Sequence, residues 1–149
     1  MSTARSSEDR LGYQLKLVQH ALRKRMEEIL RPFGLTLPQY AAMAELERHP
    51  DWTNADLAAK AFITPQSMQG VLANLEMAGL VERRQDARHG RRQLARLTKA
   101  GLSKVAQAHG ATSTVDEAIQ NALAPLVEKD VRAFFARLLS ALEPRRKPV

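Results

Sequence analysis

The segment TNADLAAKAFITPQSMQGVLANLEMAGLV, residues 53–81, decides the fold because it carries the signals of two helices joined by a short turn. Thr53 has the side chain of a helix N-cap, and Asp56 suits the positive end of the helix dipole. These signals predict a short first helix that ends at about Ala61.

The second helix of the segment begins after Thr64, which can act as another N-cap. Pro65 occupies the first helical position, where the backbone N–H has no intrahelical partner. Apolar residues at spacings of three and four then predict a helix that ends at about Ala78. Its inner face consists of Met68, Val71, Leu72 and Leu75. Gly79 fits the left-handed residue that often follows a helix, so the segment forms a helix-turn-helix.

The outer face of this second helix is rich in amide and hydroxyl side chains. Such groups can hydrogen-bond base edges in a major groove, and a helix N-terminus can hold a phosphate. An ordinary solvent-facing helix is the alternative, but a cluster of arginines follows directly. The residues of this helix predicted to contact DNA are Thr64, Gln66, Ser67, Gln69, Gly70 and Asn74.

The arginine cluster is RRQDARHGRRQLARLT, residues 83–98, with five arginines in its first ten positions and one acid, Asp86. Short apolar segments flank a charged loop containing Gly90, which predicts a β-hairpin, or wing. DNA phosphates would neutralise the arginines, and a narrow minor groove attracts them. Asp86 either orients Arg88 or caps the turn. The predicted DNA contacts of the wing are Arg83, Arg84, Asp86, Arg88, His89, Gly90, Arg91 and Arg92.

Two helices are predicted before the helix-turn-helix. Apolar residues recur at helical spacing over residues 11–30, and Gly34 ends this segment. Thr36 and Gln39 have the spacing of a capping box, which predicts a second helix that closes before Pro50.

After the hairpin the chain is again helical. Thr98 can cap a long helix, in which Gly110 weakens the middle by roughly 1 kcal/mol and predicts a bend. Pro125 is expected to start a last helix with a strong apolar stripe.

The terminal helices carry more apolar surface than a compact middle of about 90 residues can cover. We therefore expect helices of two chains to bury each other in a twofold dimer, because helix-turn-helix proteins commonly read paired half-sites. Folding back onto the chain's own core is the alternative. The expected interface residues are Leu11, Leu15, Val18, Leu22, Val131, Phe134, Phe135, Leu138 and Leu142.

The composition limits the other classes of function. A net charge of +7 and a pI of about 10.2 favour a polyanionic partner. The absence of cysteine excludes disulfides, thiol catalysis and thiolate zinc sites. No apolar run approaches the ~18 residues of a membrane span, so we expect a cytoplasmic protein without membrane contact.

No catalytic motif appears, and the four histidines form no metal-binding pair at helical spacing. Enzyme activity, a metal and a cofactor are therefore not expected.

These segments together resemble the MarR family of bacterial transcription regulators over residues 35–101. The family-like elements appear in order as LTLPQY, LAAKAFITPQSM, LEMAGLVERR, DARHGRR and LTKAG. Each element alone is weakly specific, whereas the ordered set is strong. The flanking helices also match the dimerisation region of that family in position.

The resemblance implies a winged helix-turn-helix dimer that represses transcription from a pseudo-palindromic operator and is released by a small aromatic or phenolic acid. Family wings commonly carry Asp-Arg-Arg at the position held here by His89, Gly90 and Arg91. Arg91 thus matches the family arginine that enters the minor groove, with Arg88 and Arg92 as alternatives. The absence of cysteine argues against the peroxide-sensing branch. Candidates for the effector pocket are His20, Tyr40, Met43 and Trp52.

We therefore predict a mainly α fold with a small β-hairpin wing (α+β), that is, a winged helix-turn-helix with N- and C-terminal dimerisation helices. The predicted order is a flexible tail (1–10), a dimerisation helix (11–34), the DNA-binding domain (35–98), dimerisation helices (99–143) and a basic tail (144–149). The predicted function is sequence-specific regulation of transcription. The alternative is an architectural DNA-binding protein without sequence preference, which would favour Lys-rich tails and apolar wedges.

Overall fold

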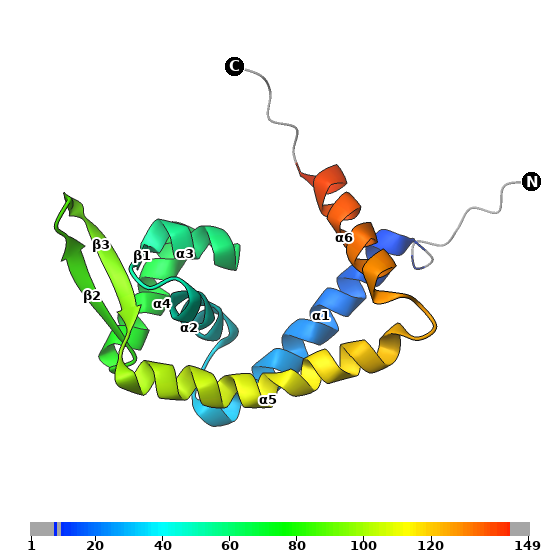
Figure 1. Ribbon diagram of the computed structural model, residues 1–149, viewed down its shortest axis with the longest axis horizontal. Coiled ribbons are helices and arrows are strands. Elements are labelled where there is room, and N and C mark those ends of the chain that lie inside the picture. Colours follow the sequence, from blue (N-terminus) through cyan, green and yellow to red (C-terminus); the bar gives the residue numbers. More distant parts are fainter. Residues whose placement is uncertain (1–7, 9, 144–149) are drawn as a thin grey trace, which may run out of the picture. The chain divides into compact units, whose positions relative to one another are not determined.

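The computed structural model describes Glu8 and residues 10–143 of the chain, so the two predicted tails lie almost entirely outside the described residues. The chain divides into two compact units, with the boundary after Ser113 (Figure 1). The first unit contains α1 (Leu11–Leu30), the 3₁₀ helix η2 (Arg31–Phe33), α2 (Leu37–Arg48), β1 (Trp52–Thr53), α3 (Asn54–Ala61), α4 (Pro65–Met77), β2 (Val81–Asp86), β3 (His89–Leu97) and the start of α5 (Lys99–Leu123). The second unit contains the end of α5 and α6 (Glu128–Leu142). The predicted mainly helical fold with a small β wing is confirmed.

The predicted starts of α2, α3 and α4 are confirmed by their caps. Thr36 and Gln39 form a reciprocal capping box at α2, and Thr53 and Asp56 form another at α3. Hydrogen bonds from the Thr53 side chain and backbone hold the pKa of the Asp56 carboxyl below its ordinary value. At α4, Thr64 Oγ1 accepts the Ser67 N–H at 3.1 Å. These caps fix where the two helices of the helix-turn-helix begin.

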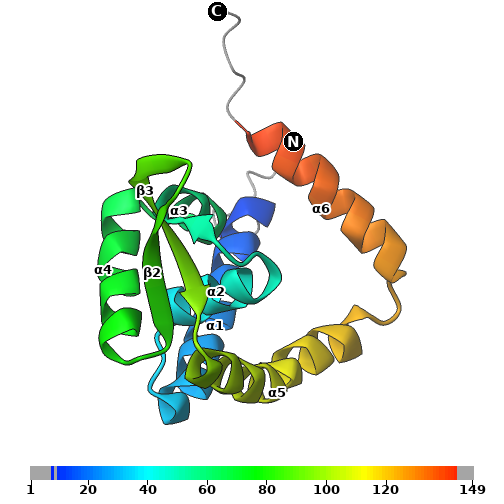
Figure 2. The ribbon, with the colours of Figure 1, turned by 60° about the vertical axis from the view of Figure 1, so that its left-hand side comes forward.

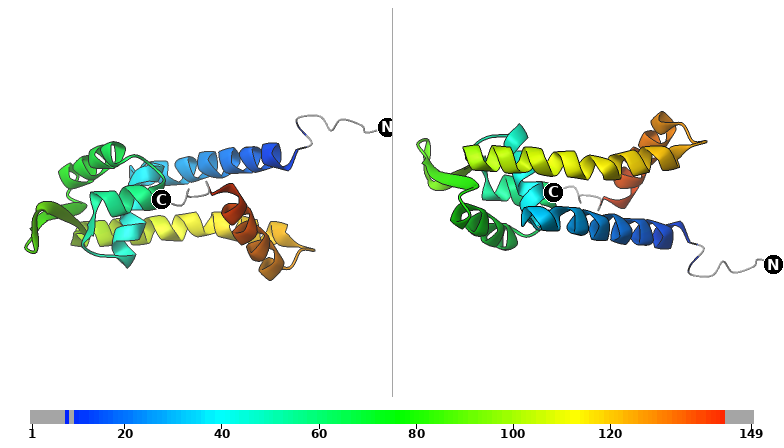
Figure 3. Two further views of the ribbon diagram at one scale, coloured as in Figure 1. Left: turned by 90° about the horizontal axis from the view of Figure 1, so that it is seen from above. Right: turned by 90° about the horizontal axis from the view of Figure 1, so that it is seen from below.

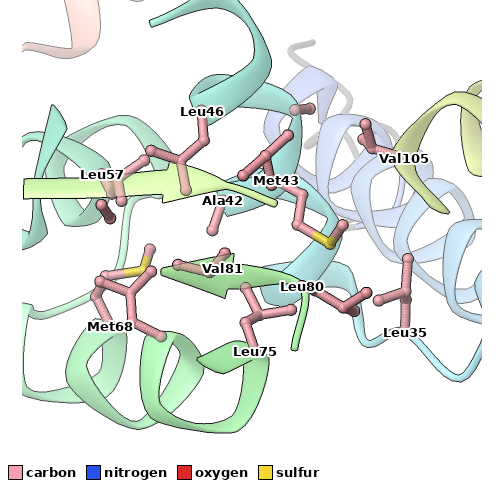
Figure 4. Packing of buried hydrophobic residues seen from close by; sticks show 14 of the residues in the cluster. Leu35, Ala42, Met43, Leu46, Leu57, Met68, Leu75, Leu80, Val81 and Val105 are labelled. Carbon is pink, nitrogen blue, oxygen red and sulfur yellow. The ribbon is translucent and has the colours of Figure 1, made fainter. Parts of the chain in front are cut away.

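One hydrophobic core holds the first unit together. Figure 4 shows side chains from α2, α3, α4 and β2 filling the space between these elements. Each fully buried Leu or Met contributes about 1.5–3 kcal/mol relative to an exposed one. The largest fully buried side chains are Leu30, Met43, Leu46, Leu57, Met68, Leu72, Leu75, Val81 and Val105. The core thus fixes α4 against the elements that surround it.

The sheet is antiparallel, with the strand order β1-β3-β2. Figure 2 shows the long hairpin of β2 and β3 alongside α4. Strand β1 is only two residues long and pairs Trp52 with Ala95 and Thr53 with Leu94. Strand β1 was not predicted from the sequence, because two residues are too few to show a period.

The predicted position of the hairpin turn was wrong. Gly90 lies within β3, and the turn consists of Ala87 and Arg88. Asp86 Oδ1 accepts the backbone N–H of Arg88 at 2.9 Å, so Asp86 caps this turn. Because this bond satisfies the backbone N–H of Arg88, the chain reverses direction at residues 87–88, before Gly90.

The predicted start of the last helix was also wrong. Helix α6 begins at Glu128 rather than at Pro125, and Glu128 and Asp130 place two acids in its first turn. Such acids stabilise the positive end of a helix dipole, which favours the later start. Helix α5 runs without interruption through Gly110.

Phe62 ends α3 in a left-handed conformation with φ 54°. The residue is 94% exposed to solvent. This conformation costs a non-glycine residue roughly 1–2 kcal/mol. We expect Phe62→Gly to raise the free energy of unfolding by about 0.5–1 kcal/mol, after the entropic cost of glycine is subtracted. Urea unfolding measures this change. Phe62→Ala removes the same ring without relieving the backbone and should give no gain. Equal stabilisation by both variants would contradict the prediction.

Candidate nucleic-acid interface

Helix α4 presents the predicted DNA-contacting side chains to solvent. Met68, Leu72 and Leu75 are buried on its inner face. The exposed residues on its outer side and at its N-cap are Thr64, Gln66, Ser67, Gln69, Gly70 and Asn74. Thr64 Oγ1 donates to Ser67 Oγ at 2.9 Å, which leaves the Ser67 hydroxyl hydrogen available to an outside acceptor. The outer side of α4 is therefore a polar face with hydrogen-bond donors.

The tip of the β2–β3 hairpin extends past the helices of the first unit (Figure 3). Its register changes abruptly from Gln85 opposite Gln93 to Asp86 opposite His89. Residues 90–92 therefore bulge out of β3 at the tip. Bulges redirect side chains and are frequent beside functional sites.

The arginines of the hairpin fall into two groups. Arg83 forms an ion pair with Glu76, and Arg84 forms one with Asp51 at 3.0 Å. Among the residues that the structure describes, three exposed arginines at the tip form no ion pair within 4 Å, although the charge of Arg92 acts on Asp56 from farther away. These are Arg88, Arg91 and Arg92. They are the charges best placed to be neutralised by an external anion.

An open groove of about 610 Å³ lies between α3, α4 and the hairpin. Gln69 of α4 lines it together with Arg91 and Arg92, and Asp56 is the one acid in its lining. Arg83 Nη1 donates to Gln69 Oε1 at 3.2 Å and so connects the hairpin to α4. The lining residues are Thr53, Asn54, Ala55, Asp56, Gln69, Leu72, Arg83, Gln85, Gly90, Arg91, Arg92, Gln93 and Ala95.

The base of the hairpin is held by Asp51, whose backbone lies at φ 68°. Arg96 donates two hydrogen bonds to its carboxylate, at 3.2 and 2.5 Å, and Arg84 approaches to 3.0 Å. The hydrogen bonds from Arg96, with the charge of Arg84, hold the pKa of the Asp51 carboxyl below its ordinary value of 3.8. The same pair raises the pKa of Arg96. Arg84 and Arg96 thus anchor the hairpin to the loop before β1.

Asp51→Asn should lower the Tm by about 3 °C at neutral pH, because it removes the ion pairs with Arg84 and Arg96. Asparagine tolerates the left-handed backbone, so the substitution changes mainly the charge. Because the folded pKa is depressed, the contribution of Asp51 is complete above the unfolded pKa, near 3.8, and disappears as pH falls through the lower folded pKa. The difference between variant and wild type should therefore shrink below about pH 4 in thermal melts. A constant difference from pH 7 to pH 3 would contradict this assignment.

The four effector-pocket candidates occupy different surroundings. Met43 is fully buried in the core, and Trp52 stacks on His49 with ring centroids 4.2 Å apart. His20 is exposed in a shallow groove on α1. Tyr40 is half-buried in a polar network between α2 and α5.

This network reaches from α2 to the last residues of the first unit. The Tyr40 hydroxyl lies 2.8 Å from His109 Nδ1 and 3.0 Å from Thr112 Oγ1, and His109 Nε2 lies 2.8 Å from Glu47 Oε2. His109 was not predicted as a site residue from the sequence, because 69 residues separate it from Tyr40. No local pattern reveals such a pair.

The predicted dimer-interface residues are exposed or half-buried. Leu11, Val18 and Leu22 on α1 expose 72%, 65% and 41% of their surface. Leu15 on α1 is half-buried. On α6, Phe134, Phe135 and Leu142 are exposed, whereas Val131 and Leu138 are half-buried. Each of the two helices therefore carries exposed apolar surface.

The described residues contain no group of three or more His, Asp or Glu side chains that could hold a metal ion. None of their helices is long and apolar enough to cross a membrane. What they do contain is a helix-turn-helix followed by a β-hairpin with an arginine-rich tip. The fold and the site therefore define a winged helix-turn-helix protein of the DNA-binding class.

Comparison with known proteins identifies the family within this class. A family model described as MarR family matches residues 33–92. The chain is 36% identical over 132 residues to the HTH-type transcriptional repressor Rv2887 of Mycobacterium tuberculosis, covering 89% of this chain and 92% of that protein. The chain thus belongs to the MarR family, whose members are non-enzymatic, DNA-binding regulators of transcription.

Solved structures agree with this assignment. Rv2887 of M. tuberculosis in complex with salicylic acid is 34% identical, with a TM-score of 0.65 over 91% of this chain and 98% of that one. The MepR–DNA complex of S. aureus is 26% identical, with a TM-score of 0.78 over 93% of this chain and 100% of that one.

Proposed function

We propose that this chain is a transcriptional repressor that binds a pseudo-palindromic operator as a homodimer. Helix α4 of each subunit enters a major groove, and the two helices lie about one turn of DNA apart, ~34 Å. The wing arginines enter the adjacent minor grooves. The observation that carries this proposal is that Gln69 of α4 lines the same groove as the exposed Arg91 and Arg92, which form no ion pair within 4 Å.

The two parts of this surface have different roles in the proposal. Gln66, Ser67, Gln69 and Asn74 read base edges, because amide and hydroxyl groups match the donors and acceptors of the major groove. Thr64 and the start of α4 contact a phosphate. The unpaired arginines supply affinity that is independent of sequence and decreases with salt.

The exposed apolar residues of α1 and α6 support the homodimer. Residues such as Leu11, Val18, Phe134 and Phe135 keep 42–72% of their surface exposed in the single chain. Burial of this surface against a second copy would stabilise the assembly. Light scattering should then give twice the 16.6 kDa mass of one chain.

The names of the relatives support the proposal that this chain represses transcription and responds to a small-molecule effector. Rv2887 is named a repressor, and one of its structures contains salicylic acid. Here Tyr40 and His109 bring a hydroxyl and an imidazole together in the first unit, where a ligand carboxylate could replace Glu47 as the partner of His109. We propose that an aromatic or phenolic acid binds near Tyr40 and lowers the affinity of the dimer for DNA. Since His20, Met43 and Trp52 lie in other surroundings, the proposal rests on Tyr40.

Binding to a labelled duplex from the chain's own upstream intergenic region tests the function. The assay contains scrambled competitor and is run at two salt concentrations. Specific regulators typically prefer their site by 10³-fold or more. Equal, steeply salt-dependent binding to both duplexes, together with no enriched sequence from a random duplex library, would instead identify an architectural DNA-binding protein. Salicylate added to the same assay tests release, with Tyr40→Phe as the variant expected to resist it.

A further inference from the structure

Gln69 is held by a chain of three side chains. Arg83 Nη1 donates to Gln69 Oε1 at 3.2 Å, while Arg83 Nε and Nη2 both donate to Glu76 Oε2, at 3.0 and 2.5 Å. Only 20% of the Arg83 side chain is exposed. Glu76 and Gln69 lie on α4 and Arg83 lies on β2, so the wing fixes a side chain of the predicted recognition helix.

The chemistry of arginine decides which way the Gln69 amide points. A guanidinium has only donors, so the atom of Gln69 that faces it must be the acceptor Oε1. The Nε2 group is then the end left for an outside partner. Because polarised hydrogen bonds strengthen one another, the cationic donor on Oε1 also makes the N–H groups of Nε2 better donors.

We propose that Arg83 is a positioning residue that makes Gln69 select guanine rather than adenine. Guanine offers two acceptors, O6 and N7, in the major groove, and these suit an outward Nε2 donor. Bidentate pairing with adenine needs Oε1 to accept from the adenine N6 amino group. That approach makes Oε1 accept with both of its lone pairs and brings the adenine N6 hydrogens close to the hydrogens of the cationic guanidinium, so it is less favourable than pairing with guanine. This inference rests on the proposed function, in which α4 reads the major groove.

The test is selection of binding sites from a random duplex library by the full chain. The wild type and the variant Gln69→Ala are compared first, to locate the base pair that depends on Gln69. That base should be guanine. Arg83→Met should then lower the guanine-to-adenine ratio at this one position, on the order of tenfold, and leave other positions unchanged.

Two further variants test whether Arg83→Met acts by releasing the Gln69 side chain, rather than by removing a charge or destabilising the fold. Arg84→Met removes the neighbouring arginine, which pairs with Asp51, and should weaken binding without changing any base preference. Glu76→Gln keeps Arg83 but removes its anchoring charge, and should shift the same ratio by a smaller factor. Glu76 is 40% exposed and glutamine has a similar helix propensity, so this variant should fold even if Arg83→Met does not.

The outcomes distinguish this inference from the proposed function. No change of preference at any position in Gln69→Ala would refute the assignment of the recognition face. A Gln69-dependent adenine in the wild type would overturn only the inference about Arg83. A Gln69-dependent guanine whose guanine-to-adenine ratio stays the same in Arg83→Met and in Glu76→Gln would also overturn only the inference about Arg83.

Discussion

Gly101→Ala is expected to lower the free energy of unfolding by about 2–3 kcal/mol, and the Tm by about 10 °C. A Cβ at residue 101 would lie 2.0 Å from the Leu80 carbonyl oxygen and 3.2 Å from Leu97 Cδ2. The nearer atom belongs to the backbone, so the clash cannot be relieved by a side-chain rotation. Thr98 holds the two segments together, because its hydroxyl donates to Gly79 O at 2.6 Å and accepts the Gly101 N–H at 3.0 Å. The start of α5 or of β2 would have to move.

Gly110→Ala is the matched control on the same helix. A Cβ at residue 110 meets no atom within 4 Å. Alanine is favoured over glycine in a helix by about 1 kcal/mol, so this variant should be more stable than the wild type. Thermal melts of the two variants should therefore shift in opposite directions. A Gly101→Ala variant as stable as the wild type would show that α5 does not start against the Leu80 carbonyl.

The helices of the DNA-binding region could be predicted because their signals are local. Thr53 and Thr64 cap the helices that follow them, and Gly79 has the left-handed φ of 69° that its position requires. Caps and turn residues act within three or four positions, so one sequence is enough to recognise them. Strand β1 was missed because its pairing partner in β3 lies about 40 residues later.

The sequence did not distinguish one wing arginine from another. Alternation along β2 directs Arg83 and Arg84 to opposite faces, where each meets a different carboxylate. Glu76 comes from α4, and Asp51 from a loop before the helix-turn-helix. Neither pairing follows from composition, because it depends on which elements pack together. The bulge that moves Arg91 out of register depends in the same way on the pairing of two strands.

Arg91→Ala is expected to weaken DNA binding on the order of a hundredfold at physiological salt, on all sequences alike. Arg91 lies in the bulge at the wing tip, lines the groove beside Gln69 and has no carboxylate partner among the described residues. Its charge is therefore available to DNA phosphates or a narrow minor groove. The proposed homodimer would lose two such charges. The plot of log affinity against log salt should then become shallower by about 1.8, since each neutralised phosphate contributes about 0.9.

Arg84→Ala is the control for this experiment, because it removes the same charge from the same hairpin. Arg84 already pairs with Asp51, so its loss should change the affinity by only about threefold and leave the salt slope nearly unchanged. If the two variants lost affinity equally, the binding surface would respond to total charge alone, and the bulge at residues 90–92 would have no special role. If Arg91→Ala had no effect while Arg92→Ala reduced the slope, the neighbouring arginine would be the one that enters the minor groove. A loss confined to Arg91→Ala, equal on specific and scrambled duplexes, would instead assign the wing to affinity and leave base selection to α4.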